Sequence, residues 1–280
     1  MESCQQCGAP IGWASERCAS CGHDIGFPNV RAARAPAETA ALEHRFNLSE
    51  AEAGESKLSR EFYGLLEAAT QSSGVVISMP AEAALNLVTN ESGLYASYED
   101  LVGSQARTPA AFANDTHRRV VAGALFGVYG AQIRYGALCL GTRGLATYGD
   151  LYCRLKEVAV QERTSFLECN SYDFLKRFGT ENQPPGYRSD WDSRGKLIVV
   201  KMQQRNILRE GQQLEDWEKS LLICDGKNRN LDEFVEAHIF GPFNVYSIEQ
   251  IVPVEPAPKG KEKLVELVID SFEAIRAAPK

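Results

Sequence analysis

The segment IRYGALCLGTRGLATYGDLYCRL, residues 133–155, carries the pattern that decides the fold. Aliphatic and aromatic residues dominate two runs within it, residues 133–140 and residues 149–155. Between these runs lie residues 141–147, whose two glycines are typical of a turn. The segment therefore predicts two successive strands joined by a turn.

Further strands are predicted on both sides of this segment, each of them a short run rich in apolar residues. They cover residues 75–79, 164–169, 197–202, 234–240 and 245–252. Helical periodicity marks residues 30–70, where Asn47, Leu48 and Ser49 predict a cap or break between two helices. Other predicted helices cover residues 81–90, 115–129, 171–178 and 261–278, and loops are expected at 105–113 and 179–195. Helices followed by a strand-rich body predict an α+β fold.

Composition and charge exclude several classes of protein. The chain has 280 residues, 44% of them hydrophobic and 24% charged, which is ordinary for a globular protein and excludes a wholly disordered one. The net charge of −7 argues against binding of polyanions by the surface as a whole. No apolar run approaches the ~18 residues of a spanning helix, and the N-terminus lacks the pattern of a signal peptide. We expect a soluble cytoplasmic protein with no membrane partner.

Four cysteines near the N-terminus have the spacing of a zinc site. Cys4, Cys7, Cys18 and Cys21 form C-x2-C-x10-C-x2-C, and a glycine follows each pair. A pair of this kind forms a tight knuckle that points two thiolates at one metal ion, so two knuckles complete a tetrahedral shell. Four thiolates leave no open coordination position, which predicts a structural zinc ion, and His23 is expected outside the shell. A redox or disulfide arrangement is the alternative.

The other four cysteines, Cys139, Cys153, Cys169 and Cys224, are scattered through apolar stretches and are expected to act as small buried side chains. Cys169 lies in a polar cluster and is a minor candidate for a nucleophile. The chain contains neither the glycine pattern of a dinucleotide-binding turn nor that of a P-loop.

Two polar clusters could carry chemistry. Residues 163–171 place Arg163, Thr164 and Ser165 at the start of a predicted strand and Asn170 and Ser171 after it, where a helix cap is the structural alternative. In the second cluster, strand alternation puts Glu236 and His238 on one face. A carboxylate and an imidazole on an apolar strand either line a wet cleft or lie on an exposed face.

Four short motifs resemble those of the ADP-ribosyltransferase superfamily, in particular its bacterial toxin-like members. They are IRYGAL (residues 133–138), GLATYGD (144–150), ERTSF (162–166) and EAHIFG (236–241), and the resemblance spans residues 74–254. It implies a split α+β sheet and the transfer of ADP-ribose from NAD to a target, or NAD hydrolysis. Together with the cysteine spacing and the predicted helices, it divides the chain into a zinc ribbon (1–28), a helical connector (29–73), the transferase-like domain (74–255) and a linker with a C-terminal helix (256–280).

The resemblance also implies roles for individual residues. Glu236 maps onto the catalytic glutamate, which stabilises the developing ribosyl cation. The residues expected to contact NAD are Arg134, Tyr148, Arg163, Thr164, Ser165, Asn170, Ser171 and His238. The predicted strand 75–79 lacks the arginine or histidine usual there, so Arg134 and Arg163 are the candidates for the phosphates. Phe234 stands where arginine-modifying members carry glutamine or glutamate, which argues against an arginine acceptor.

Two functions follow as expectations. The first is an ADP-ribosyltransferase that acts as a toxin or defence effector on a macromolecular acceptor, nucleic acid or protein, with a neutralising antitoxin or chaperone as a possible further partner. Its zinc ribbon would dock a target or partner. The second is a non-catalytic zinc-ribbon module that binds nucleic acid or protein, for which Arg17, Arg31 and Arg34 offer a small basic patch.

Overall fold

The structure is a computed structural model that describes residues 2–12, 15–90, 92–96, 115–256 and 259–278. Its strands are β1 (Gly74–Met79), β2 (Ile133–Cys139), β3 (Leu151–Leu155), β4 (Thr164–Leu167), β5 (Arg188–Ser189), β6 (Glu236–Phe240) and β7 (Ile248–Pro253). Its α-helices are α1 (Pro28–Ala33), α2 (Pro36–Glu55), α3 (Ser59–Ser72), α4 (Ala81–Thr89), α6 (Asp115–Phe126), α7 (Glu157–Val160), α8 (Ser171–Phe178), α9 (Arg194–Gln204), α10 (Leu214–Leu221) and α11 (Glu262–Ala277). Short 3-10 helices are η1 (Gly127–Gln132), η2 (Ala146–Tyr148), η3 (Gln161–Arg163), η4 (Arg229–Leu231) and η5 (Val245–Ser247).

The described strands form one seven-stranded sheet in the order β5-β4-β6-β2-β1-β3-β7, with antiparallel neighbours throughout. This confirms the α+β class. The expected split of the sheet is not observed among these strands, because the pairings of β2 with β6 and with β1 join its two halves. Both strands of the segment 133–155 are present, but they do not pair with each other, since β1 lies between them.

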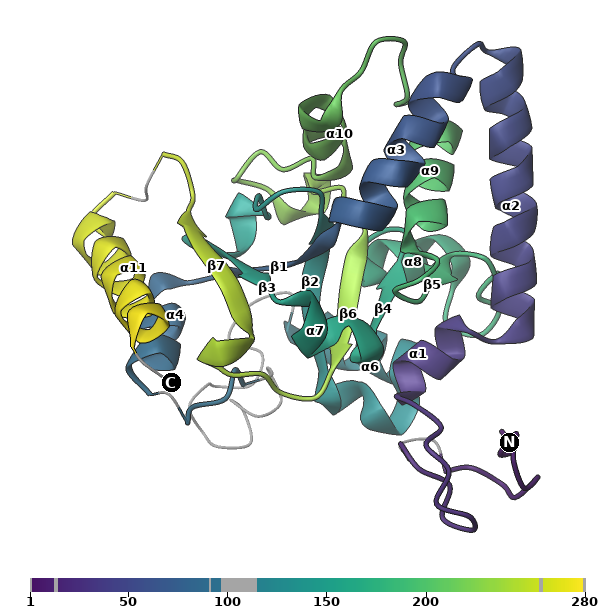
Figure 1. The fold of residues 1–280 in the computed structure, drawn as a ribbon, viewed down its shortest axis with the longest axis horizontal. Helices are drawn as coiled ribbons and strands as arrows, with labels where there is room; N and C mark the ends of the chain where they lie inside the picture. Colours follow the sequence, from purple (N-terminus) through teal and green to yellow (C-terminus); the bar gives the residue numbers. More distant parts are fainter. Residues whose placement is uncertain (1, 13–14, 91, 97–114, 257–258, 279–280) are drawn as a thin grey trace.

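Helices cover both faces of the sheet. On one face, Ala237 and Ile239 of β6 share a buried cluster with Phe62 of α3 and Leu197 of α9. Figure 1 shows α2, α3 and α9 packed alongside one another in this layer. On the other face, Phe240 packs with side chains of α6 and α8. Strand β6 is therefore enclosed by apolar layers, which sets the environment of any polar group that it carries.

The predicted strand at residues 197–202 is wrong, because these residues belong to α9. The run LIVVKM is buried around the helix circumference, with Leu197, Ile198, Val199 and Val200 all 0% exposed. A continuous apolar run fits a buried strand and a buried helix equally well, so periodicity could not separate the two. The loop expected at 179–195 likewise contains β5 and the start of α9.

The helices of residues 28–72 are part of the main core. Leu42 and Phe46 of α2 and Phe62 and Leu65 of α3 lie in the same cluster as the strands. The break predicted at residues 47–49 is wrong, because α2 continues to Glu55 and the chain turns between α2 and α3 instead.

The C-terminal helix α11 packs against α4 and buries Val265, Val268 and Phe272. The strands at 75–79, 164–169, 234–240 and 245–252 and the helices at 81–90, 115–129, 171–178 and 261–278 are confirmed with shifted ends. The loop predicted at 105–113 lies outside the described residues. None of the described helices has both the length and the apolar character needed to cross a membrane.

Candidate metal centre and candidate active site

The four-cysteine segment, residues 2–26, contains two knuckles with the same backbone geometry. In the first, Gly8 donates its N–H to the carbonyl of Cys4, and in the second Gly22 donates to Cys18. Both glycines have a positive φ, 71° and 72°, a conformation that disfavours residues with a Cβ atom. The glycine after each cysteine pair therefore lets the chain turn back and direct both thiols of a pair toward one point.

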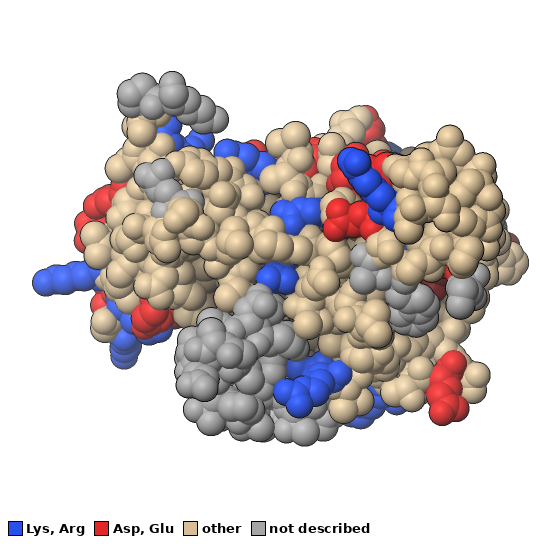
Figure 2. Space-filling model, turned by 90° about the horizontal axis from the view of Figure 1, so that it is seen from below, with Lys and Arg blue, Asp and Glu red and all other residues tan. Residues whose placement is uncertain are grey.

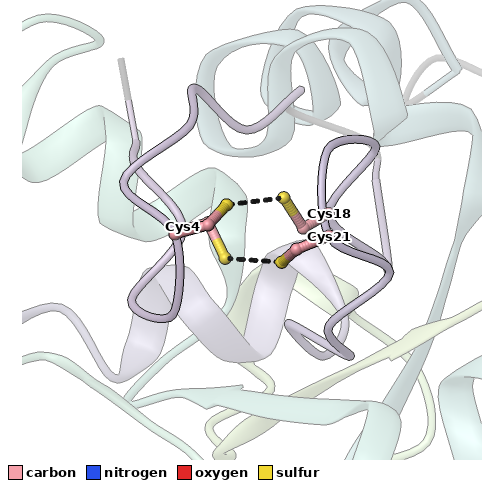
Figure 3. A group of neighbouring side chains, drawn as sticks. Cys4, Cys18 and Cys21 are labelled. Atoms are coloured by element: carbon pink, nitrogen blue, oxygen red, sulfur yellow. Dashed lines mark hydrogen bonds between the residues drawn. The ribbon is translucent and has the colours of Figure 1, made fainter.

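The four sulfur atoms lie within 4.8 Å of one another. Figure 3 shows the thiols of the two knuckles facing each other, with 3.8 Å between the sulfurs of Cys4 and Cys21. The sulfurs of Cys7 and Cys18 are 3.6 Å apart. A tetrahedral shell with Zn–S bonds of about 2.3 Å separates its sulfurs by about 3.8 Å, whereas a disulfide bond needs about 2.05 Å. The donor set fits a zinc ion and does not fit disulfide pairs.

Helix α1 connects the four-cysteine segment to the sheet. Arg31 forms an ion pair with Glu2 at 3.0 Å and donates to the carbonyl oxygens of Ser15 and Gly26. Asn29, which is 2% exposed, donates from Nδ2 to the backbone oxygens of Arg163 and His238 and to Oγ of Ser165. One short helix thus holds both knuckles on one side and strands β4 and β6 on the other.

These contacts bear on the basic patch expected near the N-terminus. Arg31 pairs with Glu2 of the four-cysteine segment itself. The guanidinium of Arg34 lies 2.6 Å from the carboxylate of Asp190 and 3.4 Å from that of Asp192. On the face drawn in Figure 2, basic side chains are separated by acidic and uncharged ones. Two of the three arginines of the expected patch are therefore paired within the chain.

Glu236 and His238 occupy the same face of β6, as alternation predicted, and both side chains are buried rather than on an exposed face. Their side chains are 7% and 4% exposed. Glu236 Oε2 accepts hydrogen bonds from the backbone N–H of Ser171, at 2.9 Å, and from the Ser171 hydroxyl. His238 Nε2 lies 3.0 Å from the same oxygen and 3.1 Å from Ser171 Oγ. The first residue of α8 and two residues of β6 thus form one polar cluster.

Aromatic rings enclose this polar cluster. Phe126 of α6 meets the imidazole of His238 edge-on at 4.8 Å, and Tyr135 of β2 does so at 5.5 Å. Tyr148 packs edge-on against Phe234, two residues before Glu236, with 6.4 Å between the ring centroids, and burial raises the pKa of Tyr148. A carboxylate buried in such surroundings needs hydrogen-bond partners, and Ser171 supplies two.

The two oxygens of Glu236 differ in their contacts. The hydrogen bonds described above all end on Oε2, and Oε1 accepts none from the residues that the structure describes. The carboxylate is therefore fixed in direction through one oxygen.

Some predicted site residues do not join this cluster. Arg134 and Thr164 both pair with Ile239, so they lie on the opposite face of the sheet from Glu236 and His238. The Thr164 hydroxyl donates to the carbonyl of Val160 within its own turn. Sequence reasoning could not assign faces to β2 and β4, because the register of a strand against its neighbours depends on tertiary pairing.

Three further predicted residues have structural partners. Arg163 donates to the carbonyl oxygens of Ala159, Phe240 and Pro242, at the far end of β6 from Glu236. Asn170 caps α8 by accepting from the N–H of Tyr172, the role that was its structural alternative. Ser165 is directly opposite His238 in the sheet and is bound by Asn29.

Sequence reasoning missed two residues, one of which contacts Tyr148 and the other the backbone next to the polar cluster. The guanidinium of Arg229 lies over the ring of Tyr148 at 4.6 Å, and Lys201 reaches the backbone on either side of the polar cluster. An exposed arginine in a loop and a lysine in an apolar run carry no local signal of such a role.

Two mechanisms are disfavoured by the geometry. Ser171 Oγ and Glu236 Oε2 approach the same nitrogen of His238, whereas a serine hydrolase relay needs the serine and the carboxylate on different ring nitrogens. Burial raises the pKa of the Cys169 thiol to about 12, which disfavours a nucleophilic thiolate. What the cluster offers is an oriented carboxylate that can stabilise a positive charge.

Comparison of the chain with protein-family models found no match, and comparison with curated protein sequences found none.

Proposed function

We propose that this protein is an NAD-dependent ADP-ribosyltransferase and that Glu236 is its catalytic carboxylate. The observation that carries the proposal is the state of Glu236, which Ser171 and His238 hold through Oε2 while no described residue donates to Oε1. A carboxylate that is oriented in advance stabilises a developing cation without reorganising during the reaction. The motif EAHIFG, on which the resemblance rests, supplies this strand.

In the proposed reaction, the bond between the nicotinamide nitrogen and the ribose carbon breaks, and nicotinamide leaves as a neutral molecule. Positive charge develops on the ribose, and the carboxylate of Glu236 stabilises it. A nucleophilic atom of the acceptor then bonds to the ribose carbon and loses its proton. The acceptor is a macromolecule, protein or nucleic acid, which fits a toxin or defence effector.

Tyr148 and Arg229 are the proposed contacts for the rest of NAD. The ring of Tyr148 packs against Phe234, two residues before Glu236, and would offer an aromatic surface to the nicotinamide, and Arg229 would offer a guanidinium for a phosphate. Arg229 is exposed, so it can turn from the ring toward a ligand. In this proposal it takes the place of Arg134 and Arg163, whose positions do not suit a ligand at Glu236.

The proposed metal is one zinc ion held by Cys4, Cys7, Cys18 and Cys21. Its role is structural, because four thiolates close the coordination shell.

NAD consumption by the purified, zinc-loaded protein tests the proposal. Glu236→Gln removes the charge and keeps the shape, so turnover should fall by at least about 10²-fold with little change in melting temperature. Glu249→Gln is the matched control, because Glu249 also lies on a strand but its side chain is 54% exposed. Offering protein, RNA and DNA as acceptors identifies the labelled class.

Full turnover in Glu236→Gln would show that the catalytic assignment is wrong. Absence of both NAD turnover and NAD binding in the zinc-loaded wild type would instead favour the non-catalytic binding module.

A further inference from the structure

Lys201 is a charged residue in the middle of the core. It lies on α9, and its side chain is 0% exposed. Lysine is almost never fully buried unless its ammonium group is paired, because removing that charge from water is costly. Its surroundings should therefore show what the charge does there.

Three oxygens surround the ammonium group. Nζ donates to the carbonyl oxygen of Glu168 at 2.7 Å and to that of Phe234 at 2.8 Å, and it lies 2.9 Å from the Glu233 carboxylate. Arg205 also pairs with Glu233, so the carboxylate is shared between two cations. The ammonium group thus donates two hydrogen bonds to backbone carbonyls, and the ion pair with Glu233 compensates its charge.

The two carbonyls belong to the segments that bring Glu236 and Ser171 together. Phe234 precedes Glu236, the first residue of β6, by two residues. Glu168 precedes Ser171 by three residues, where β4 ends and the chain turns into α8. Leu167 and Glu236 are directly paired in the sheet, so the ammonium group bridges the two chains next to this pair.

We propose that Lys201 is a positioning residue for the candidate site, which holds the start of β6 and the start of α8 in the register that lets Ser171 bind Glu236. The catalytic part of this inference rests on the proposed function, whereas the positional part does not. A hydrophobic side chain of similar length could fill the space but could not bind two carbonyl oxygens. Without Lys201 these oxygens would be left without a donor, and the two segments would be free to separate.

The test uses Lys201→Met, which keeps a long unbranched side chain and removes the ammonium group. Lys196→Met is the control, because Lys196 lies on the same helix but its side chain is 39% exposed and pairs with Glu43 at the surface. The first measurement is amide hydrogen exchange of Ser171, whose N–H donates to Glu236. The second is the steady-state kinetics of NAD turnover.

In Lys201→Met we expect the Ser171 amide to exchange about tenfold faster, relative to amides of β1 and β3, which lie on the far side of β2. We expect kcat to fall by about 10²-fold with KM close to the wild-type value, because a displaced carboxylate affects the transition state more than binding. Should Lys201→Met fail to fold, Lys201→Gln keeps an uncharged NH2 group as donor and should give a smaller change in the same direction.

Unchanged relative exchange at Ser171 in a folded variant would overturn the proposal, as would uniformly faster exchange over the whole sheet. The exchange measurement does not depend on catalysis. If the wild-type protein turns over no NAD, the proposed function fails, while faster exchange at Ser171 alone would still support the positional role.

Discussion

Asn29 links parts of the chain that are far apart in sequence. Its Nδ2 group donates to oxygens of Arg163, Ser165 and His238, which lie up to 209 residues away. The backbone oxygen of His238 lies two residues after Glu236 on the same strand, whereas Lys201 binds the backbone two residues before Glu236. Asn29 and Lys201 therefore hold the chain on either side of Glu236. One amide group therefore holds β4 and β6 to α1.

Removing this amide should destabilise the fold. Asn29→Ala leaves buried oxygens without a donor, for which we expect a loss of about 1–3 kcal/mol in the free energy of unfolding. Asn29→Asp should cost more, because it places a carboxylate oxygen against the backbone carbonyl oxygens of Arg163 and His238. Urea denaturation followed by fluorescence measures both, and equal stability of the two variants would contradict the role of Nδ2 as the donor.

Residue-level prediction succeeded where it depended on local geometry. Strand alternation placed Glu236 and His238 on one face, and the spacing of Cys4, Cys7, Cys18 and Cys21 identified the cluster of four sulfurs. It did not identify the contacts of Asn29, Lys201 and Arg229, because these depend on the packing of distant segments. The same limitation put Arg134 and Thr164 in the expected NAD site, although they point to the other face.

At the scale of elements, α9 shows where hydrophobic pattern is insufficient. The run at 197–202 was predicted as a strand because β-branched residues favour strands, but it packs as a helix against α2 and α3. Because this helix is buried on all sides, its sequence lacks the regularly spaced polar residues that would indicate a helical period. The turn before α9 is fixed instead by polar contacts, in which Asp190 accepts from the N–H of Ser193 at 2.9 Å and from its hydroxyl.

This turn should respond to acid. Burial acts to raise the pKa of Asp190, but hydrogen bonds from Ser193 and the guanidinium of Arg34 outweigh it and lower the pKa below its usual value of 3.8. A lowered pKa in the folded state means that the charged form contributes stability above pH 3.8, which is lost as pH falls through the folded-state pKa.

Asp190→Asn should therefore be less stable than wild type by about 1–2 kcal/mol near neutral pH, and the difference should shrink below pH 3.8. Denaturant unfolding of both proteins between pH 2 and pH 7 measures it. A difference that stays constant over this range would show that the charge of Asp190 contributes nothing.

For the whole molecule, the contacts of Arg31 tie the four-cysteine segment to the body. Among the described residues of the four-cysteine segment (2–12 and 15–26), Cys4, Ile11 and Cys18 form a small buried core. A segment of this length cannot offset the loss of chain entropy on folding by burial of apolar side chains alone. Zinc binding would therefore supply most of its folding free energy. Arg31 and Asn29 both lie on α1. Unfolding of residues 2–26 should therefore also loosen β4 and β6, which Asn29 contacts.

We expect one zinc ion per chain, released by a strong chelator and measured by a colorimetric zinc assay. Removal should make residues 2–26 exchange their amide hydrogens at the rate of an unfolded peptide and lower the melting temperature of the body. Exchange should increase next in α1 and then in β4 and β6, with α4 and α11 unaffected because they lie at the other end of the molecule (Figure 1).

Cys4→Ser should behave as the chelated protein does, whereas Cys224→Ser, outside the metal group, should retain its zinc. Arg31→Ala separates the two effects, because it should keep the zinc ion and still loosen α1 by removing the contacts with Glu2, Ser15 and Gly26. If zinc removal left α1, β4 and β6 as protected as before, the four-cysteine segment would be an independent module, and its function would have to be sought in contacts with other molecules.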